Sequence, residues 1–179
     1  MRHLALLRGI NVNGHRIVPM ADLRHLCAEL GWTDIQTYIQ SGNVLLTASV
    51  PAQELSRTLQ AAIAERFGFD VPVAVLSLSE LDTLVSANPF VEEGCETKSL
   101  YVTVFAAPLA ADRPDAVDWD AFPPERGVLA ARWAYLHLPN GYHAARLNNA
   151  YLERRLGVEA TTRNWKTMGR LAAMGHTAP

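Results

Sequence analysis

Apolar and polar positions alternate with two different periods through the first half of the chain, and these periods predict strands and helices in turn. Pro19 suits the first position of one helix, which Gly31 ends, and Pro51 opens a second helix, which Gly68 ends. Between and around the helices, continuous apolar runs and two-residue alternation predict strands. These strands cover residues 2–8, 34–40, 43–48 and 71–76.

The resulting order over residues 1–77 is βαββαβ, which is typical of a ferredoxin-like α+β sandwich. Pro72, near the start of the fourth strand, indicates that this strand lies at an edge of the sheet. Apolar side chains on the two helices are expected to be buried against the sheet, namely Leu23, Leu26, Leu55, Leu59, Ile63 and Phe67.

Residues 78–179 are predicted to form a related, divergent second α/β unit with C-terminal helices, either as a separate domain or packed with the first unit as one domain. Residues 106–124 are rich in proline and predict a loop with one short helix. The last helix is expected to start near Thr161 or Thr162. The other expected elements are strands at 100–105, 128–131 and 133–138 and a helix that Gly157 ends. A structural duplication is a hypothesis that this order supports, although no sequence repeat is visible.

Composition and charge indicate an ordinary soluble globular protein. Hydrophobic residues make up 49% of the 179 residues, charged residues make up 19%, and the net charge is −2, so no overall basic field favours nucleic acid or an anionic membrane. Cys27 and Cys95 form no CxxC pair. The apolar run after His3 is too short for a signal peptide, and no apolar run reaches the roughly 18 residues of a membrane span. We therefore expect a reduced, cytoplasmic protein.

Glycines and polar residues gather in two segments that each follow a predicted strand. Arg8 closes the first strand, and Gly9, Asn13 and Gly14 behind it are residue types that accept a positive φ. The second segment is the turn at residues 40–43. In a βαββαβ sandwich the first and second strands run parallel with another strand between them, so their carboxyl ends lie at the same edge of the sheet. We therefore expect the two segments to be neighbours.

A third polar cluster, residues 161–164, lies at the predicted start of the last helix. A helix N-terminus presents free N–H groups and a partial positive charge, and Arg163 adds a two-pronged donor, a combination that suits phosphate, sulfate or a carboxylate. Structural interpretations stay open, because threonine is a common N-cap residue and Arg163 can pair with an acidic neighbour. Arg8 likewise can bind a ligand or bond backbone carbonyls across its own loop.

No residue pattern predicts a catalytic group or a metal site. Ser41 stands in QSGN, which is not a nucleophile elbow, and the six histidines show no spacing typical of metal ligands. Asp112, Asp115, Asp118 and Asp120 are more typical of a solvated acidic loop than of a calcium loop. The sequence therefore predicts no catalytic residue, cofactor or metal, and it does not decide whether the protein is an enzyme.

Three segments, LLRGINVNGHRIVPM, TYIQSGNV and ATTRNWKT, resemble the bacterial domain-of-unknown-function family 1697 in order and spacing, from Leu6 to Leu171. The resemblance implies a small cytoplasmic α+β protein with no established activity or cofactor. Asn13 stands where the family is expected to have glycine, and Arg146 stands where relatives tend to have lysine. The residues at the family's motif positions are Arg8, Gly9, Asn11, Gly14, Gln40, Ser41, Gly42, Asn43, Thr162, Arg163 and Asn164.

Our leading hypothesis is a protein that binds an anionic small molecule, such as a nucleotide or a phosphorylated metabolite, at a site formed by all three polar clusters. The arginines would supply charge, and amides and hydroxyls would supply neutral hydrogen bonds. The candidate ligand-binding residues are Arg8, Asn11, Asn13, Gln40, Ser41, Asn43, Thr162, Arg163 and Asn164.

Two other classes of function compete with this hypothesis. Ferredoxin-like sheets often bind RNA or single-stranded nucleic acid, but only Tyr38 offers an aromatic ring on the first two strands. The other alternative is a protein-interaction or structural module in which the polar clusters hold one another together. Asn11, Asn13 and Asn43 are typical turn-formers, which favours that interpretation for them. Nothing in the sequence indicates the oligomeric state.

Overall fold

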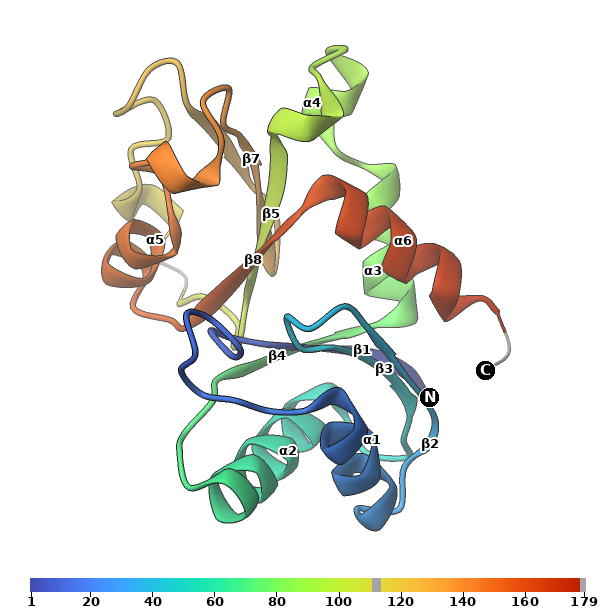
Figure 1. The fold of residues 1–179 in the computed structure, drawn as a ribbon. Coiled ribbons are helices and arrows are strands. Elements are labelled where there is room, and N and C mark those ends of the chain that lie inside the picture. Colours follow the sequence, from blue (N-terminus) through green and yellow to red (C-terminus); the bar gives the residue numbers. More distant parts are fainter. Residues whose placement is uncertain (111–113, 178–179) are drawn as a thin grey trace. The chain divides into compact units, whose positions relative to one another are not determined.

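The computed structural model describes residues 1–110 and 114–177, which form two compact units (Figure 1). The first unit contains Met1–Asp82 and Arg170–Pro179, and the second contains Thr83–Gly169. The predicted domain division into residues 1–77 and 78–179 stays a prediction. The compact units differ from it mainly in that the C-terminal segment belongs with the first unit.

The first unit has the predicted ferredoxin-like order. Its elements are β1 (Arg2–Leu7), α1 (Met20–Glu29), β2 (Thr33–Tyr38), β3 (Asn43–Thr47), α2 (Ala52–Phe67) and β4 (Val73–Ser77). The sheet order is β2-β3-β1-β4, and every neighbouring pair is antiparallel. Strand β4 therefore lies at an edge, as Pro72 predicts. Because β3 separates β1 from β2, these two strands run parallel. Their carboxyl ends therefore lie at the same edge of the sheet, here the edge that is formed by the strand ends.

Helices α1 and α2 cover one face of this sheet (Figure 1). Five predicted core residues are buried there, namely Leu23, Leu26, Leu55, Leu59 and Ile63. Phe67 was expected to be buried too, but it is only partly buried. It is the last residue of α2, where the chain leaves the sheet through Gly68 in the left-handed conformation.

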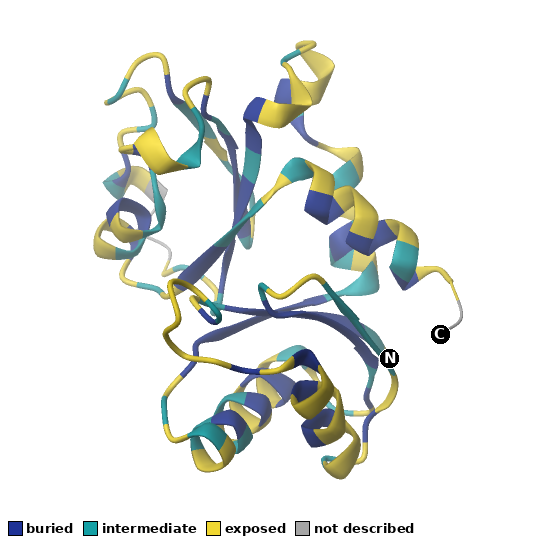
Figure 2. Cartoon of the chain, viewed as in Figure 1, coloured by how far each residue is buried: buried dark blue, intermediate teal, exposed yellow. Residues whose placement is uncertain are grey.

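The opposite face of the sheet is also buried (Figure 2), and its side chains are aliphatic, namely Leu4, Leu6, Leu45 and Leu76. Part of the cover comes from the C-terminal helix α6 (Trp165–Gly175). A Cβ atom built on Gly175 would lie 2.4 Å from Leu78 Cδ1 and 3.8 Å from Leu45 Cδ2. In addition, Nε2 of His176 lies 2.8 Å from the Asp82 carboxylate. These contacts explain why the C-terminal segment belongs with the first unit.

Both helices of the first unit begin one residue later than predicted. Pro19 and Pro51 have extended backbone conformations, with ψ of 135° and 155°, and they are N-caps rather than first helical residues. The ring of proline restricts φ to a value that helix and extended chain share, so the residue type alone does not decide ψ. Gly68 ends α2 at φ 79°, as predicted.

The second unit repeats the strand order of the first. Its elements are α3 (Leu78–Ser86, which starts in the first unit), α4 (Pro89–Glu92), η1 (Thr97–Ser99), β5 (Leu100–Phe105), η2 (Pro114–Ala116), β6 (Arg126–Leu129), β7 (Trp133–His137), η3 (Tyr142–Ala144), α5 (Asn149–Leu156) and β8 (Ala160–Asn164). The sheet order β6-β7-β5-β8 matches β2-β3-β1-β4 position by position, again with antiparallel neighbours. This match supports the duplication hypothesis. Asp112 lies outside the described residues.

The predicted helix start near Thr161 or Thr162 is wrong. These residues belong to β8, and α6 begins only at Trp165. Strand β8 pairs with β5 so that Thr162 lies opposite Thr103, and their hydroxyl oxygens are 2.8 Å apart. Threonine is favoured both at helix N-caps and in strands, so the pairing partner decides between them.

Truncation of Leu59 tests the core of the first unit. Leu59 is fully buried against the sheet, so Leu59→Ala should lower the free energy of unfolding by about 2–5 kcal/mol in a urea melt. Thr58→Ala, at an exposed position of the same helix, should change it by less than about 0.5 kcal/mol. Equal effects at the two positions would contradict the assignment of the buried helix face.

Burial of His3 predicts a pH-dependent stability. His3 is 2% exposed, and burial lowers its pKa below the usual 6.5; the positive N-terminus acts in the same direction, whereas Glu80 and the Val50 backbone oppose it. The unfolded chain therefore takes up a proton at a pH where folded His3 resists it, so the free energy of unfolding should fall as the pH drops below 6.5.

The measurement is urea denaturation at about pH 7.5 and at about pH 5.5, on either side of the histidine pKa. His3→Leu should reduce the loss of stability between these two values. The same substitution at exposed His143 provides the control. An unchanged loss in His3→Leu would show that this imidazole is not a source of the pH dependence.

Candidate functional site

Strands β1 and β2 bring the first two polar segments together, as predicted. Strand β1 leads into the Arg8–Pro19 loop, and β2 leads into the Ile39–Gly42 turn. The backbone N–H of Leu7 donates to the carbonyl of Gly42 over 2.8 Å. The loop and the turn are therefore neighbours at one edge of the first unit's sheet.

The side-chain amide of Asn11 connects the loop to the turn. Its Nδ2 donates to the Val18 carbonyl over 2.9 Å and to the Gln40 carbonyl over 2.8 Å, while its Oδ1 accepts the Val18 N–H over 2.9 Å. Asn11 has a positive φ of 55°, which asparagine tolerates better than most residues. Its amide is committed to the protein, which favours the structural interpretation for this residue.

Asn13 and Gly14 form a tight turn at the tip of the loop. Their φ values are 50° and 76°, and the His15 N–H donates to the Val12 carbonyl over 2.9 Å. Two successive residues with positive φ are the requirement of a type I′ turn, for which the pair Asn-Gly is strongly preferred. Asn13 is exposed, so it is a turn-former whose side chain points to solvent.

The Ile39–Gly42 turn is held by close packing and by Asn43. A Cβ at Gly42, whose φ is 78°, would lie 2.6 Å from the Leu7 Cβ, so no other residue fits without displacing β1. Asn43 is fully buried and donates to the Tyr38 carbonyl and to Ser41 Oγ, over 2.9 and 3.0 Å. These two motif residues thus brace the turn, and Gln40 remains exposed.

The loop and the turn carry basic residues without a carboxylate. Residues 8–19 and 38–43 contain Arg8, His15 and Arg16 and no Asp or Glu. Arg8 is half-buried and its backbone N–H donates to the Pro72 carbonyl over 2.9 Å, whereas His15 and Arg16 are exposed. His15 and Arg16 were not among the predicted ligand-binding residues, although the lack of acidic residues around them is visible in the sequence.

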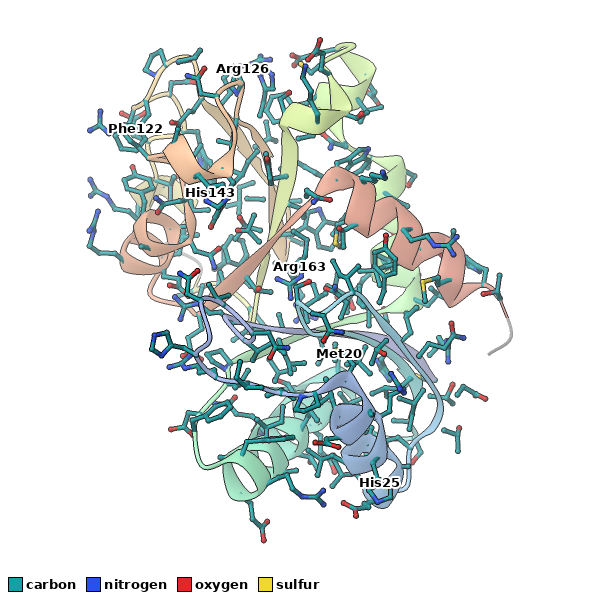
Figure 3. All side chains as sticks on the ribbon, in the orientation of Figure 1. Met20, His25, Phe122, Arg126, His143 and Arg163 are labelled. Carbon is teal, nitrogen blue, oxygen red and sulfur yellow. The ribbon has the colours of Figure 1, made fainter. Side chains whose placement is uncertain are left out.

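The third polar cluster lies in the second unit and is bonded within it. Thr162 Oγ1 donates to Asn149 Oδ1 over 2.6 Å, and Arg163 (labelled in Figure 3) donates to Thr161 Oγ1 over 2.6 Å. Burial lowers the pKa of Arg163 to about 10, so its side chain still carries a charge at neutral pH. Asn164 is the residue that caps α6, since its Oδ1 accepts the Thr167 N–H over 2.8 Å. Convergence of this cluster with the other two stays a prediction.

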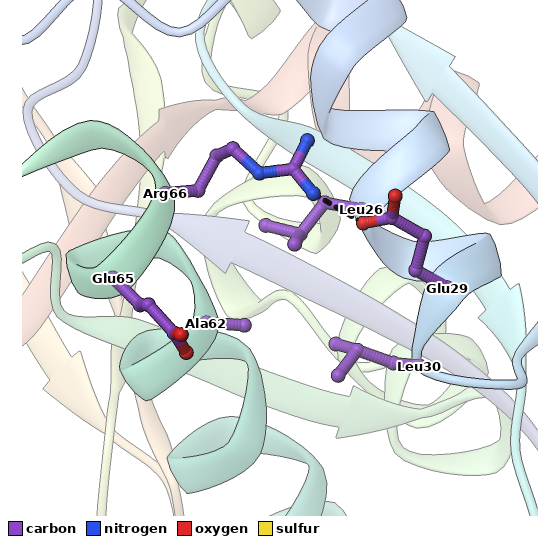
Figure 4. A pocket seen from close by; sticks show the side chains of 6 residues that line it. All are labelled: Leu26, Glu29, Leu30, Ala62, Glu65 and Arg66. Carbon is purple, nitrogen blue, oxygen red and sulfur yellow. Dashed lines mark hydrogen bonds and ion pairs between the residues drawn. The ribbon is translucent and has the colours of Figure 1, made fainter.

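A groove of about 490 Å³ lies between α1 and α2 and contains none of the predicted site residues. Its floor is aliphatic, from Leu26, Leu30 and Ala62 (Figure 4). Arg66 and Glu29 form an ion pair across it. Both charges are roughly half exposed and satisfy each other, which is ordinary for the surface between two helices.

Other chemistry finds little support in the described residues. No group of three or more His, Cys, Asp or Glu residues within 1–110 and 114–177 is placed to hold a metal ion. Among the same residues, every helix is too short or too polar to cross a membrane. Burial raises the pKa of the Cys27 thiol to about 12, so this cysteine stays protonated and unreactive in the core.

The fold and the site together define a small α+β protein that consists of a ferredoxin-like unit, with basic residues on its Arg8–Pro19 loop (the basic loop), and a second unit with the same strand order. The chain belongs to the family described as a protein of unknown function (DUF1697), whose model matches residues 1–135 and so confirms the resemblance. The conserved bacterial protein SP0830 from Streptococcus pneumoniae has a similar structure, with a TM-score of 0.76 and 22% sequence identity over 97% of this chain and 98% of that chain. At this identity the likeness shows the fold. No curated protein matches the chain.

The bridging role of Asn11 can be tested with an isosteric substitution. Asn11→Asp keeps the oxygen that accepts the Val18 N–H but replaces the donor to two carbonyls, so it should lower the free energy of unfolding by about 1–3 kcal/mol in a urea melt. Asn13→Asp, in the exposed turn two residues later, should cost less than about 0.5 kcal/mol. If the two variants were equally stable, Asn11 would not be the connection between loop and turn.

Proposed function

We propose that the first unit binds an anionic small molecule at the edge where the Arg8–Pro19 loop meets the Ile39–Gly42 turn. The observation that carries this proposal is the set of basic residues on two loops that contain no carboxylate. The whole chain has a net charge of −2, so this local excess of positive charge is not a consequence of a basic composition. A charge of one sign gathered on one edge attracts ligands of the opposite sign.

Arg16 is the residue that a purely structural interpretation does not explain. It is exposed, and its side chain has no hydrogen-bond or ion-pair partner in the described part of the chain. Its φ is 49°, and its carbonyl accepts the Asn11 N–H over 3.1 Å, so its backbone is held in place. The backbone thus places the guanidinium at this edge without any internal use for the charge.

The start of α1 adds a second source of positive potential. Pro19 caps this helix without a side-chain hydrogen bond, so the first N–H groups remain available at the end of the loop. Asp22 in the first turn is the carboxylate that opposes this effect. The Asp22 carboxylate would repel an anion bound at this helix start. The affinity for the anion therefore depends on how far the attraction by Arg8 and Arg16 exceeds this repulsion.

The planar forks of arginine suit phosphate, sulfate and carboxylate groups. We therefore favour a nucleotide or a phosphorylated metabolite as the ligand class. Exposed Gln40 supplies a neutral donor and acceptor next to the bridge that Asn11 makes. Thr162, Arg163 and Asn164 are predicted ligand-binding residues too, but the proposal for the first unit does not require them.

Nucleic-acid binding is less well supported. RNA-binding ferredoxin-like units stack bases on aromatic residues of the exposed sheet face. In this protein one face of the first sheet is covered by α1 and α2, and the other is aliphatic and buried. The sheet of the first unit therefore offers no stacking platform for bases.

The test is a thermal-shift titration with inorganic phosphate and pyrophosphate against chloride at constant ionic strength. A specific anion site should stabilise the protein by about 2.7 kcal/mol at a hundredfold excess over Kd. Arg16→Gln should raise the Kd for phosphate several-fold and so reduce the stabilisation at a given phosphate concentration, whereas Arg57→Gln, at an exposed position of α2, should not alter it. Asp22→Asn should strengthen it, because the substitution removes the opposing charge.

Two results would overturn the proposal. Equal stabilisation by phosphate and chloride would show general screening rather than a site. An unchanged phosphate effect in Arg16→Gln would place any anion elsewhere. Arg163→Ala, measured in the same titration, separates the two versions of the hypothesis, because it matters only if the third cluster contributes.

A further inference from the structure

The second unit contains a separate cavity of about 450 Å³, at the start of β6 and the end of β7. This volume is within the range of small-molecule sites. Three prolines supply the apolar walls, and four polar residues complete the lining. The lining residues are Asp120, Pro123, Pro124, Glu125, Arg126, His137 and Pro139.

Two of the charged residues of the cavity are already satisfied within the protein. The carboxylate of buried Glu125 accepts the backbone N–H groups of Arg146 and Leu147, at distances between 2.7 and 3.1 Å. Arg126 (labelled in Figure 3) donates to Glu93 over 2.7 Å, and its guanidinium lies 4.9 Å from the centre of the Phe90 ring. Neither residue has its charge free for a ligand.

Two other polar groups of the lining lack partners. In the described part of the chain, Nδ1 of His137 is buried without a hydrogen-bond partner, and the exposed Asp120 carboxylate has none either. The Nδ1 atom has almost no accessible surface, so it is closed off from a ligand in the cavity, and the exposed Asp120 carboxylate is the unpaired polar group that a ligand can reach. Burial lowers the pKa of His137, and so does nearby Arg126, although Glu93 opposes them. The imidazole is therefore neutral at pH 7, and it adds no positive charge to the cavity.

We propose that this cavity binds a flat apolar molecule that carries a protonated amine, with the ring between the prolines and the amine at the Asp120 carboxylate. The proline walls favour a ring. The charged residues of the cavity predict a positive charge on the ligand. Arg126 is paired with Glu93 and Glu125 is bonded to backbone N–H groups, so Asp120 is left as an unpaired negative charge.

This site is independent of the basic loop in the first unit and has the opposite charge preference. Its test uses the full chain and two probes with the same indole ring, tryptamine and indole-3-acetate. Binding is followed by proton–nitrogen NMR spectra, which report both the Kd and the amides that shift. Tryptamine should shift the amides around Asp120, Arg126 and His137. It should bind about tenfold more tightly than indole-3-acetate, because the exposed charge of Asp120 attracts one probe and repels the other by up to about 1 kcal/mol each.

A matched pair of variants locates the charge. Asp120→Asn should bring the two affinities together, whereas Asp115→Asn, at an exposed position outside the cavity, should leave the ratio unchanged. His137→Phe keeps an aromatic ring beside Phe90 and, because Nδ1 is closed off from the cavity, should also leave the ratio of the two affinities unchanged. The proposal fails if the probes bind equally to the unaltered protein, if Asp120→Asn has no effect on their ratio, or if no amide near the cavity shifts.

Discussion

The hydrogen bonds of the Asn11 side-chain amide are the interaction on which the first unit's candidate site depends. They tie the Arg8–Pro19 loop to Gln40 in the neighbouring turn and fold the loop back on Val18. The loop contains Asn11, Asn13 and Arg16 in left-handed conformations, which are costly for residues other than glycine. The bonds of Asn11 offset part of this cost, so the loop can hold its basic side chains at a defined edge.

The two units use one sheet order and have different described elements between their first and second strands. In the first unit this segment is the basic loop followed by α1. In the second it is the proline-rich stretch that holds η2 and then Asp120, Pro123 and Pro124 of the cavity. The sheets need these connections only to pass from one strand to another, so their sequences were free to diverge. The connection between the first and second strands therefore contributes residues to the candidate site in each unit. The first unit's connection contributes basic residues, and the second unit's connection contributes the acidic Asp120.

Much of the first unit could be predicted because each of its elements has a single strong period. The core side chains of α1 and α2 recur at helical spacing, and β1, β3 and β4 read as apolar runs because they are buried on both faces, whereas β2 is polar and at most partly buried. The adjacency of loop and turn followed from the order βαββαβ alone. Threonine-rich β8 was missed because Thr161 and Thr162 satisfy the requirements of a helix cap and of a strand equally well.

The sequence by itself determined the family, the fold class and the positions of the polar clusters, since these depend on local periodicity and on residue types in order. Only the tertiary structure decided what the polar side chains do. Asn11, Asn43 and Thr162 are engaged with partners that are between 2 and 59 residues away in the chain, and Arg16, in the same motif as Asn11, is not. Residue type and spacing are the same for an amide that braces a turn and one that meets a ligand. The difference lies in which atoms come within hydrogen-bonding distance, and the packing of the strands decides that.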